Sequence, residues 1–364
     1  MQIKAKITGI KYKCKLIPKL SENSFDTFAI NELPSSTIVR DENFLFGLSK
    51  WVSPKRTRSY PYERVYNTLG NSKRITVIPI IKDEGKRGDR DFIQWDTVSL
   101  MNLLDVFVIF AYFNDAEKHL TRENKITNQK FDNNLVEEKI TEIKNYHSSA
   151  LHWNLKEIEE TLPNLIQKAK DTFHNFNQNL KVEFHAEQGI DRFAEQFQNG
   201  VKNFMETSRR KAQEAQNREM QTVQPKEALS SLTKATITIE NYLGGKYYFT
   251  TDEIKIENKT VFLIEDKHSK TSLLPSVGDI KDGLLKMILY TNLKDVFING
   301  NEYFAKPVLK LTSTKLTGGI TSNDNITKAF FEKNDFFSKQ IDVIEKLFSE
   351  ARDNGFIVKI ESAE

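Results

Sequence analysis

The sequence predicts a mixed α/β (α+β) protein in three parts, and three observations lead to this fold class. Near the start of the chain, apolar runs rich in β-branched residues alternate with a helical pattern. The middle has almost no glycine and repeats apolar residues at helical intervals. Towards the end, strand patterns surround an amphipathic helix. We therefore expect an α/β domain at 1–113, a long helical region at 114–225, and a mixed β-sheet flanked by helices at 226–364.

The composition is that of a globular protein with a sizeable core. Hydrophobic residues make up 38% and charged residues 28% of the 364 positions. The net charge is +3, so attraction to nucleic acid has to come from local clusters of basic residues. Cys14 is the only cysteine, which excludes a disulfide within the chain and indicates a reducing, cytoplasmic setting. No apolar run approaches the ~20 residues of a membrane helix, so we expect no membrane partner.

The first part has the pattern of a strand–helix–strand unit. The opening residues alternate like a strand, and residues 75–81 form a β-branched, apolar run typical of a buried strand. Pro79 favours an edge position or a bulge there. Residues 95–104 have helical spacing, and residues 106–113 form a second buried strand. This order predicts a parallel pair of strands.

The middle part reads as helices throughout. Apolar residues at helical intervals over 151–173 and again over 190–204 predict at least three long helices. Pro163 either kinks one of them or begins a new one. Residues 213–224 are polar and fit a linker.

The strongest functional signal is a predicted hairpin in the last part. Its turn is at 257–259, its first strand carries Asp252, and its second strand ends in Glu265, Asp266 and Lys267. Because side chains alternate along a strand, Glu265 and Lys267 share one face. The hairpin brings Asp252 near the same end. Two carboxylates and an ammonium group at one point can hold Mg²⁺ and activate a water molecule against a phosphodiester.

The remaining elements of this part follow in order. A short helix is expected at 227–233, and a strand at 236–242 precedes the hairpin. An amphipathic helix is expected at 280–289. Strands at 296–298 and 303–311, helices up to residue 352, and a final strand at 356–360 complete the chain.

The order of these features resembles that of the PD-(D/E)XK nuclease superfamily: an aspartate, a spacer, Glu-x-Lys on an apolar strand, and then an amphipathic helix. Within it, the chain is similar to type II restriction endonucleases, over roughly its last third. The resemblance implies that Asp252 is the metal-bridging aspartate, Glu265 the second metal ligand, and Lys267 the lysine beside the attacking water. Thr251 stands where the family often has proline, and Asp266 fills a position that is usually apolar or small.

The resemblance also implies an activity and partners. The expected activity is Mg²⁺-dependent, site-specific hydrolysis of double-stranded DNA by a homodimer. In such an enzyme we expect the domain at 1–113 to help recognise DNA, and the helical region at 114–225 to clamp the duplex or to form the dimer interface. A cognate DNA methyltransferase is the expected genetic partner. Two alternatives stay open: a nuclease of this superfamily with an RNA substrate or another defence role, and a nucleic-acid-binding protein without catalysis.

Predicted DNA contacts come from basic residues in two regions. The stretch 50–90 holds eleven Lys and Arg residues against four acids, with Trp and Tyr residues interleaved. Lys270 follows the predicted catalytic strand, and Lys281 lies on a helix that in this superfamily often sends a lysine towards the phosphate. In each case an ordinary solvated surface is the alternative. The predicted DNA-binding residues are Lys55, Arg56, Arg58, Lys86, Arg87, Arg90, Lys270 and Lys281.

An acidic group in the first part is a rival metal site. It follows a buried strand, as a catalytic aspartate would. The next strand, at 106–113, lacks a Glu-x-Lys pattern, so we place the active site in the last part of the chain. The rival group consists of Asp83, Glu84, Asp89, Asp91 and Asp96.

Overall fold

The computed structural model describes residues 1–42, 44–55, 61–197, 200–207, 210, 233–241, 246–324 and 328–363. It confirms the mixed α/β fold class. The chain divides into two compact units instead of the three expected parts: a first unit of Met1–Pro18 with Lys211–Glu364, and a second unit of Lys19–Arg210. Among the described residues, no helix combines the length and hydrophobicity that a membrane span requires.

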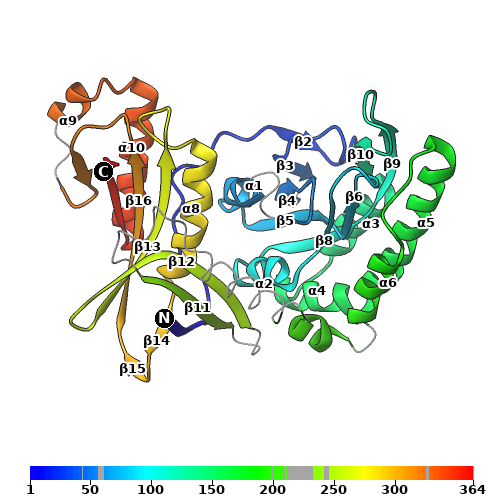
Figure 1. Ribbon diagram of the computed structural model, residues 1–364, viewed down its shortest axis with the longest axis horizontal. Helices are drawn as coiled ribbons and strands as arrows, with labels where there is room; N and C mark the ends of the chain where they lie inside the picture. Colours follow the sequence, from blue (N-terminus) through cyan, green and yellow to red (C-terminus); the bar gives the residue numbers. More distant parts are fainter. Residues whose placement is uncertain are drawn as a thin grey trace. The chain divides into compact units, whose positions relative to one another are not determined.

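The first unit is built on a nine-stranded mixed sheet (Figure 1). The spatial order of its strands is β15 (Asn301–Glu302), β14 (Lys294–Ile298), β1 (Gln2–Ile7), β11 (Thr233–Asn241), β12 (Lys246–Glu257), β13 (Thr260–Ser269), β16 (Phe304–Ser313), β18 (Ile357–Ser362) and β17 (Gly319–Thr321). β11, β12 and β13 form an antiparallel meander, and β13, β16 and β18 are parallel neighbours. The helical crossover between β13 and β16 is what allows these two strands to be parallel.

The strand expected at the start of the chain is confirmed, but it belongs to this sheet and not to an α/β domain at 1–113. β1 pairs in parallel with β11 and antiparallel with β14. Its alternate residues Ile3, Ala5 and Ile7 are buried, and they continue the apolar face that Ile237 and Ile239 form on β11. Burial of this shared face explains the pairing of two strands from opposite ends of the sequence.

Two helices of the first unit pack against strands of its sheet. α8 (Val277–Tyr290), the helix expected at 280–289, begins at Ser276, whose side chain accepts a hydrogen bond from the Asp279 amide. It runs along β13 and β16, in yellow in Figure 1. α10 (Ser338–Asn354) packs on β18 and ends at Gly355, where φ is 75°. The short α9 (Lys328–Lys333) precedes it.

The second unit contains a five-stranded sheet in the order β2 (Glu22–Ser24), β3 (Ser36–Asp41), β4 (Phe44–Lys50), β5 (Lys73–Pro79) and β8 (Phe107–Ala111). The predicted parallel pair is confirmed, since β5 and β8 are parallel. The helices α1 (Pro61–Thr68) and α2 (Trp95–Leu103) connect the parallel strands. The edge position inferred from Pro79 is wrong, because β5 lies between β4 and β8. Pro79 is the last residue of β5, where a missing N–H disturbs the ladder least.

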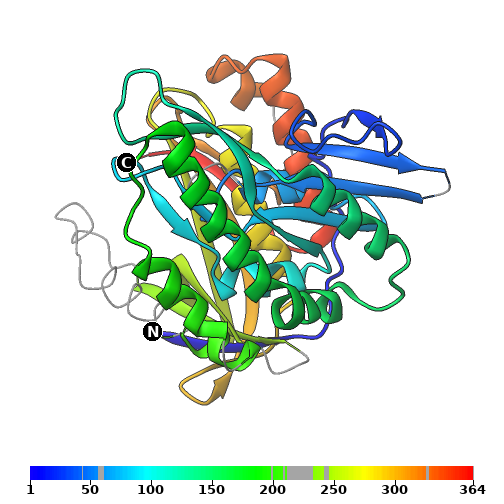
Figure 2. The ribbon, with the colours of Figure 1, turned by 90° about the vertical axis from the view of Figure 1, so that its right-hand side faces the viewer.

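The region 114–225, which was expected to be helical, contains helices and also a β-hairpin. The helices are α3 (Asn133–Lys144), α4 (Ala150–Lys156), α5 (Leu162–Leu180), α6 (Gln188–Ala194) and the short η3 (Glu195–Phe197). Pro163 begins a new helix, since a π-helical turn, η2 (Glu157–Thr161), joins α4 to α5 just before it. The strands β9 (Phe113–Lys118) and β10 (Ile126–Phe131) were not expected; their ring pair Phe113–Phe131 is stacked at 4.7 Å. α5 packs on β9 and β8 (Figure 2).

A two-stranded ribbon, β6 (Ile81–Asp83) and β7 (Arg90–Phe92), completes the second unit. Two expectations fall outside the described residues: the linker at 213–224 and most of the helix at 227–233. Thr233, the last residue of that expected helix, is the first residue of β11.

Candidate active site

The predicted hairpin is confirmed, and its two strands separate at the predicted site. β12 ends at Glu257 and β13 begins at Thr260, with Asn258 at φ 53° in the turn. The two strands pair only as far as Glu253 and Ile264. Beyond that point β13 continues to pair with β16, whereas β12 pairs with β11. The next residues along the two strands are Asp252 and Glu265, so both lie where the strands part.

A β-bulge marks the same point on β12. Ala235 of β11 pairs with Thr251, and Thr233 pairs with Ile254, so two steps on β11 match three on β12. The extra residue bends a strand and redirects its side chains, and such bulges are common next to active sites. Oδ2 of Asp252 accepts a hydrogen bond of 3.0 Å from the Asp266 amide. The carboxylate of Asp252 is thereby anchored to β13 beside Glu265.

Glu265 is a buried carboxylate neutralised by two lysines. Glu265 is 1% exposed. Oε1 lies 3.0 Å from Nζ of Lys267, and Oε2 lies 2.6 Å from Nζ of Lys286. Burial raises the pKa of Glu265; Lys286 opposes this effect, and the negative charge of Asp252 adds to it. The two carboxylates are therefore close enough to repel each other.

Lys267 lies between two carboxylates from different elements. Its Nζ is 3.0 Å from Glu265 and 2.8 Å from Oδ2 of Asp282 on α8. Burial disfavours the charged form, but the two carboxylates outweigh burial and raise the pKa of Lys267. Lys267 therefore remains a protonated, fixed donor at neutral pH.

Gly283 lets α8 approach the strands closely enough for these contacts. A Cβ atom at this position would lie 2.7 Å from Cδ1 of Leu309 and 3.4 Å from Cε of Lys267. The first distance is too short for two carbon atoms. A side chain at position 283 would therefore force the buried Leu309 to shift where α8 packs on β13 and β16.

Asp282 and Lys286 were not among the predicted site residues. They are four residues apart on α8, and therefore on one helix face, and both contact the Glu265–Lys267 pair. Lys286 is 9% exposed, so its side chain needs a partner within the protein. The signal that could have identified them is a pair of opposite charges at this spacing on a mostly apolar helix.

The residues at the strand separation fit a magnesium ion. Mg²⁺ prefers oxygen ligands, keeps several waters, and is usually held by one or two carboxylates. Asp252 and Glu265 supply two carboxylates, and the repulsion by Asp252, which adds to burial in raising the pKa of Glu265, is what a divalent cation would relieve. In the residues that the structure describes, no group of three or more His, Cys, Asp or Glu side chains could hold a metal. The candidate site is thus a two-carboxylate site with an adjacent lysine.

Some predicted DNA contacts are exposed and others are outside the described residues. Lys55, Arg87 and Lys270 are exposed. Arg56 and Arg58 lie outside the residues that the structure describes.

The other predicted DNA contacts have partners in the protein or are buried. Lys86 forms an exposed ion pair of 2.8 Å with Glu183. Arg90 donates to the carbonyl of Ala186 at 2.8 Å. Lys281 is only 4% exposed, so it does not lie on a solvated helix face.

Further basic residues of the stretch 50–90 stabilise the second unit. Lys50 donates to the carbonyls of Ile30 and Asn31, and Arg64 donates to the carbonyl of Lys50. Burial, together with the charge of Arg64, lowers the pKa of Lys50 to about 8. Sequence stretch 50–90 is therefore not a single basic surface.

The rival acidic group is divided among separate partners. Glu84 lies 2.9 Å from both Lys82 and Lys125; burial opposes its ionisation, but the two lysines prevail and lower its pKa to about 2. Asp83 lies 2.8 Å from Nδ1 of His185. Asp91 accepts a hydrogen bond from the Ser53 hydroxyl. These contacts fix the β6–β7 ribbon and give no metal-binding group among the described residues.

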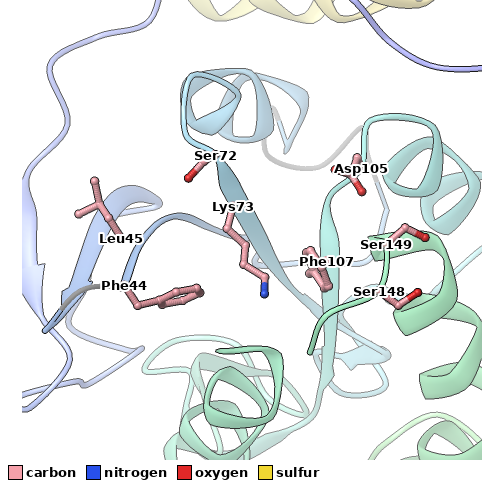
Figure 3. Close-up of a pocket in the computed structure, with 8 residues that line it drawn as sticks. All are labelled: Phe44, Leu45, Ser72, Lys73, Asp105, Phe107, Ser148 and Ser149. Carbon is pink, nitrogen blue, oxygen red and sulfur yellow. The ribbon is translucent and has the colours of Figure 1, made fainter. Parts of the chain in front are cut away.

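A cavity of about 440 Å³ lies at the amino ends of three strands of the second unit (Figure 3). Phe44, Lys73 and Phe107, from the starts of β4, β5 and β8, line it. The ammonium group of Lys73 lies 5.3 and 4.9 Å from the centroids of the two rings. It donates to the carbonyls of Ile143 and Tyr146 at the end of α3. Lys73 thus holds a helix end, and the cavity belongs to a different unit from Glu265 and Lys267.

Comparisons with protein-family models, curated proteins and solved structures give no match for this chain. Support for a function therefore comes from the site. Its distinguishing features are Asp252 anchored where two strands part, a buried Glu265, and Lys267 held between two carboxylates.

Proposed function

We propose that the chain is a Mg²⁺-dependent, site-specific endonuclease that hydrolyses phosphodiester bonds in double-stranded DNA. The observation that carries the proposal is the separation of β12 and β13 at Asp252 and Glu265, with Lys267 on the face of Glu265. This is the arrangement expected from the resemblance to PD-(D/E)XK nucleases of the type II restriction class. The following helix, α8, contributes contacts to the same site.

The residues of the site have distinct roles in this proposal. Asp252 and Glu265 would hold Mg²⁺, which when bound would acidify a water molecule and neutralise charge on the phosphate. Lys267 is kept protonated by its two carboxylates, so it donates to the water or to a phosphate oxygen and does not act as a base. Asp282 keeps the lysine in this position. The site thus fixes its positive charge before the substrate binds, which is how electrostatic stabilisation is most effective.

Substrate binding and assembly belong to the same proposal. Lys55, Arg87 and Lys270 contact DNA phosphates, and the helices α3 to α6 clamp the duplex or form a dimer interface. A homodimer places one active site at each strand. A cognate methyltransferase protects the host sequence, and both proteins act in the cytoplasm.

The test compares wild type with Lys267→Ala on plasmid and phage DNA, in Mg²⁺ and in EDTA. Lys346→Ala is the matched control, because Lys346 forms an exposed i,i+4 pair with Asp342 on α10. We expect discrete fragments from wild type and the control in Mg²⁺ only. The Lys267→Ala rate should fall on the order of 10²-fold or more, as for other lost donors in active sites.

Other outcomes would change the proposal in defined ways. A smear that disappears in Lys267→Ala would retain the catalytic site and reject sequence-specific cleavage. Intact DNA with a gel shift would support the non-catalytic nucleic-acid-binding alternative. Cleavage by Lys267→Ala at the wild-type rate would reject this active site and direct attention to the acidic group around Asp83.

A further inference from the structure

The two lysines at Glu265 differ in what else they can bind. Lys267 has a second carboxylate, Asp282, at 2.8 Å. Among the residues that the structure describes, the further acceptor of Lys286 is the backbone carbonyl of Thr250, at 3.4 Å. Glu265 balances only one of the two lysines, and the second counter-charge, Asp282, lies at Lys267 and not at Lys286.

We propose that Asp282 is a receiving carboxylate that allows a divalent cation to exchange with Lys267 at Oε1 of Glu265. Lys286 stays on Oε2 as a fixed counter-ion. Asp282 and Lys286 are both positioning residues, since they act through Glu265 and Lys267. This inference rests on the proposed metal-dependent function and adds the residues that control cation entry.

The contacts determine at which oxygen of Glu265 the cation replaces a lysine. A cation at Oε2 would displace Lys286 and leave its ammonium group, on a residue 9% exposed, beside a backbone carbonyl alone. Leaving a buried charge without a counter-charge is strongly unfavourable. A cation at Oε1 displaces Lys267, which keeps its shorter contact with Asp282. Oε1 is therefore the exchangeable position.

The charges of the site agree with this exchange. Lys267 and Lys286 balance Glu265 and Asp282, which leaves the single negative charge of Asp252. A divalent cation changes the net charge from −1 to +1, and a phosphodiester carries one negative charge. Without Lys286 the loaded site would be neutral and would no longer attract the phosphate. Lys286 thus contributes to substrate binding as well as to folding.

Binding of Mn²⁺, measured by titration calorimetry and by its paramagnetic resonance signal, tests the exchange without any cleavage assay. Asp282→Asn should weaken Mn²⁺ binding about tenfold or more, because displaced Lys267 then lacks a charged acceptor. Lys286→Met should tighten Mn²⁺ binding about tenfold, because it removes a positive charge that faces the ion. The matched controls Asp342→Asn and Lys346→Met, on the exposed pair of α10, should bind as wild type does.

Opposite shifts in the two variants would support the exchange, since a merely structural role gives no such difference in sign. Equal shifts, or shifts no larger than those of the controls, would overturn the exchange. If wild type still bound Mn²⁺ and cleaved DNA, the proposed function would remain intact. If wild type binds no Mn²⁺ at millimolar concentration, the metal-dependent function itself fails and the exchange fails with it. Should Asp282→Asn not fold, tighter binding by Lys286→Met decides the question alone.

Discussion

The Glu265→Gln substitution removes the one carboxylate that both lysines of the site share. Glutamine has nearly the same shape, so packing against Leu309 and the other apolar neighbours is retained. Its amide oxygen still accepts one hydrogen bond, but it carries no charge. Any change in the free energy of unfolding therefore reports mainly on the ion pairs.

The expected loss can be worked out from the contacts that remain. Lys267 keeps Asp282, whereas Lys286 is left with the carbonyl of Thr250 at 3.4 Å. Removing one partner of a buried ion pair costs about 3–5 kcal/mol, so we expect a loss of about 3 kcal/mol for Glu265→Gln. Lys286→Met in the same background removes the unpaired ammonium group. The double variant should recover roughly 2 kcal/mol, which is a large coupling for two residues.

Hydrogen exchange of the amides in β13 and α8 is the suitable assay. All three tryptophans, Trp51, Trp95 and Trp153, belong to the second unit, so their fluorescence does not report on the site. A loss of about 3 kcal/mol lowers the protection of these amides by about two orders of magnitude. Glu183→Gln, on an exposed pair with Lys86, is the control and should leave protection unchanged.

Two results would refute this reasoning. Protection in Glu265→Gln within a few-fold of wild type would mean that Lys286 finds another counter-charge. A double variant less stable than Glu265→Gln would mean that the aliphatic stem and ammonium of Lys286 contribute through packing, not through the pair.

Three further predictions concern packing and pH. Gly283→Ala should cost about 1–3 kcal/mol and reduce cleavage, because its Cβ would lie 2.7 Å from Leu309 and press on Lys267; unchanged melting and cleavage would contradict this. The pKa of Glu84 is about 2 in the folded chain, below its usual value of 4.5, so it contributes stability that is lost as pH falls from about 4.5 towards 2. Glu84→Gln should therefore flatten the fall in melting temperature between pH 6 and pH 3, and an unchanged slope would count against it. The pKa of Lys50, about 8 when folded and 10.5 otherwise, predicts stability that rises with pH between these values; Lys50→Met should lack this rise in melts at pH 7.5 and pH 10.

The candidate site shows which contacts a sequence can and cannot predict. Glu265 and Lys267 are two residues apart on one strand, so their shared face follows from strand geometry alone. Asp282 and Lys286 reach them only through the rotation of α8 about its axis. α8 is buried on nearly every side, so its apolar pattern does not determine which side faces β13.

The same limit explains the opening strand. The alternation of Ile3, Ala5 and Ile7 predicts a strand with one buried face, and this is confirmed. Its partner, β11, lies more than two hundred residues along the chain. Pairing over such a separation depends on which apolar faces are left to be covered, and local pattern carries no information about that choice.

The number of basic residues in the stretch 50–90 does not show how many are free to bind a ligand, for a related physical reason. Lys50 and Lys73 donate to backbone carbonyls at loop and helix ends, where an ammonium group satisfies acceptors that the fold leaves open. Such a lysine has neutral acceptors and fixes one arrangement of the chain. Lys267 differs because both of its acceptors are carboxylates, on β13 and on α8. Lys139 also has two carboxylate partners, Glu142 and Glu157, so such a pair does not by itself mark an active site. What separates the candidate active site from these structural contacts is the further negative charge of Asp252, which is anchored beside Glu265 and is available to a cation.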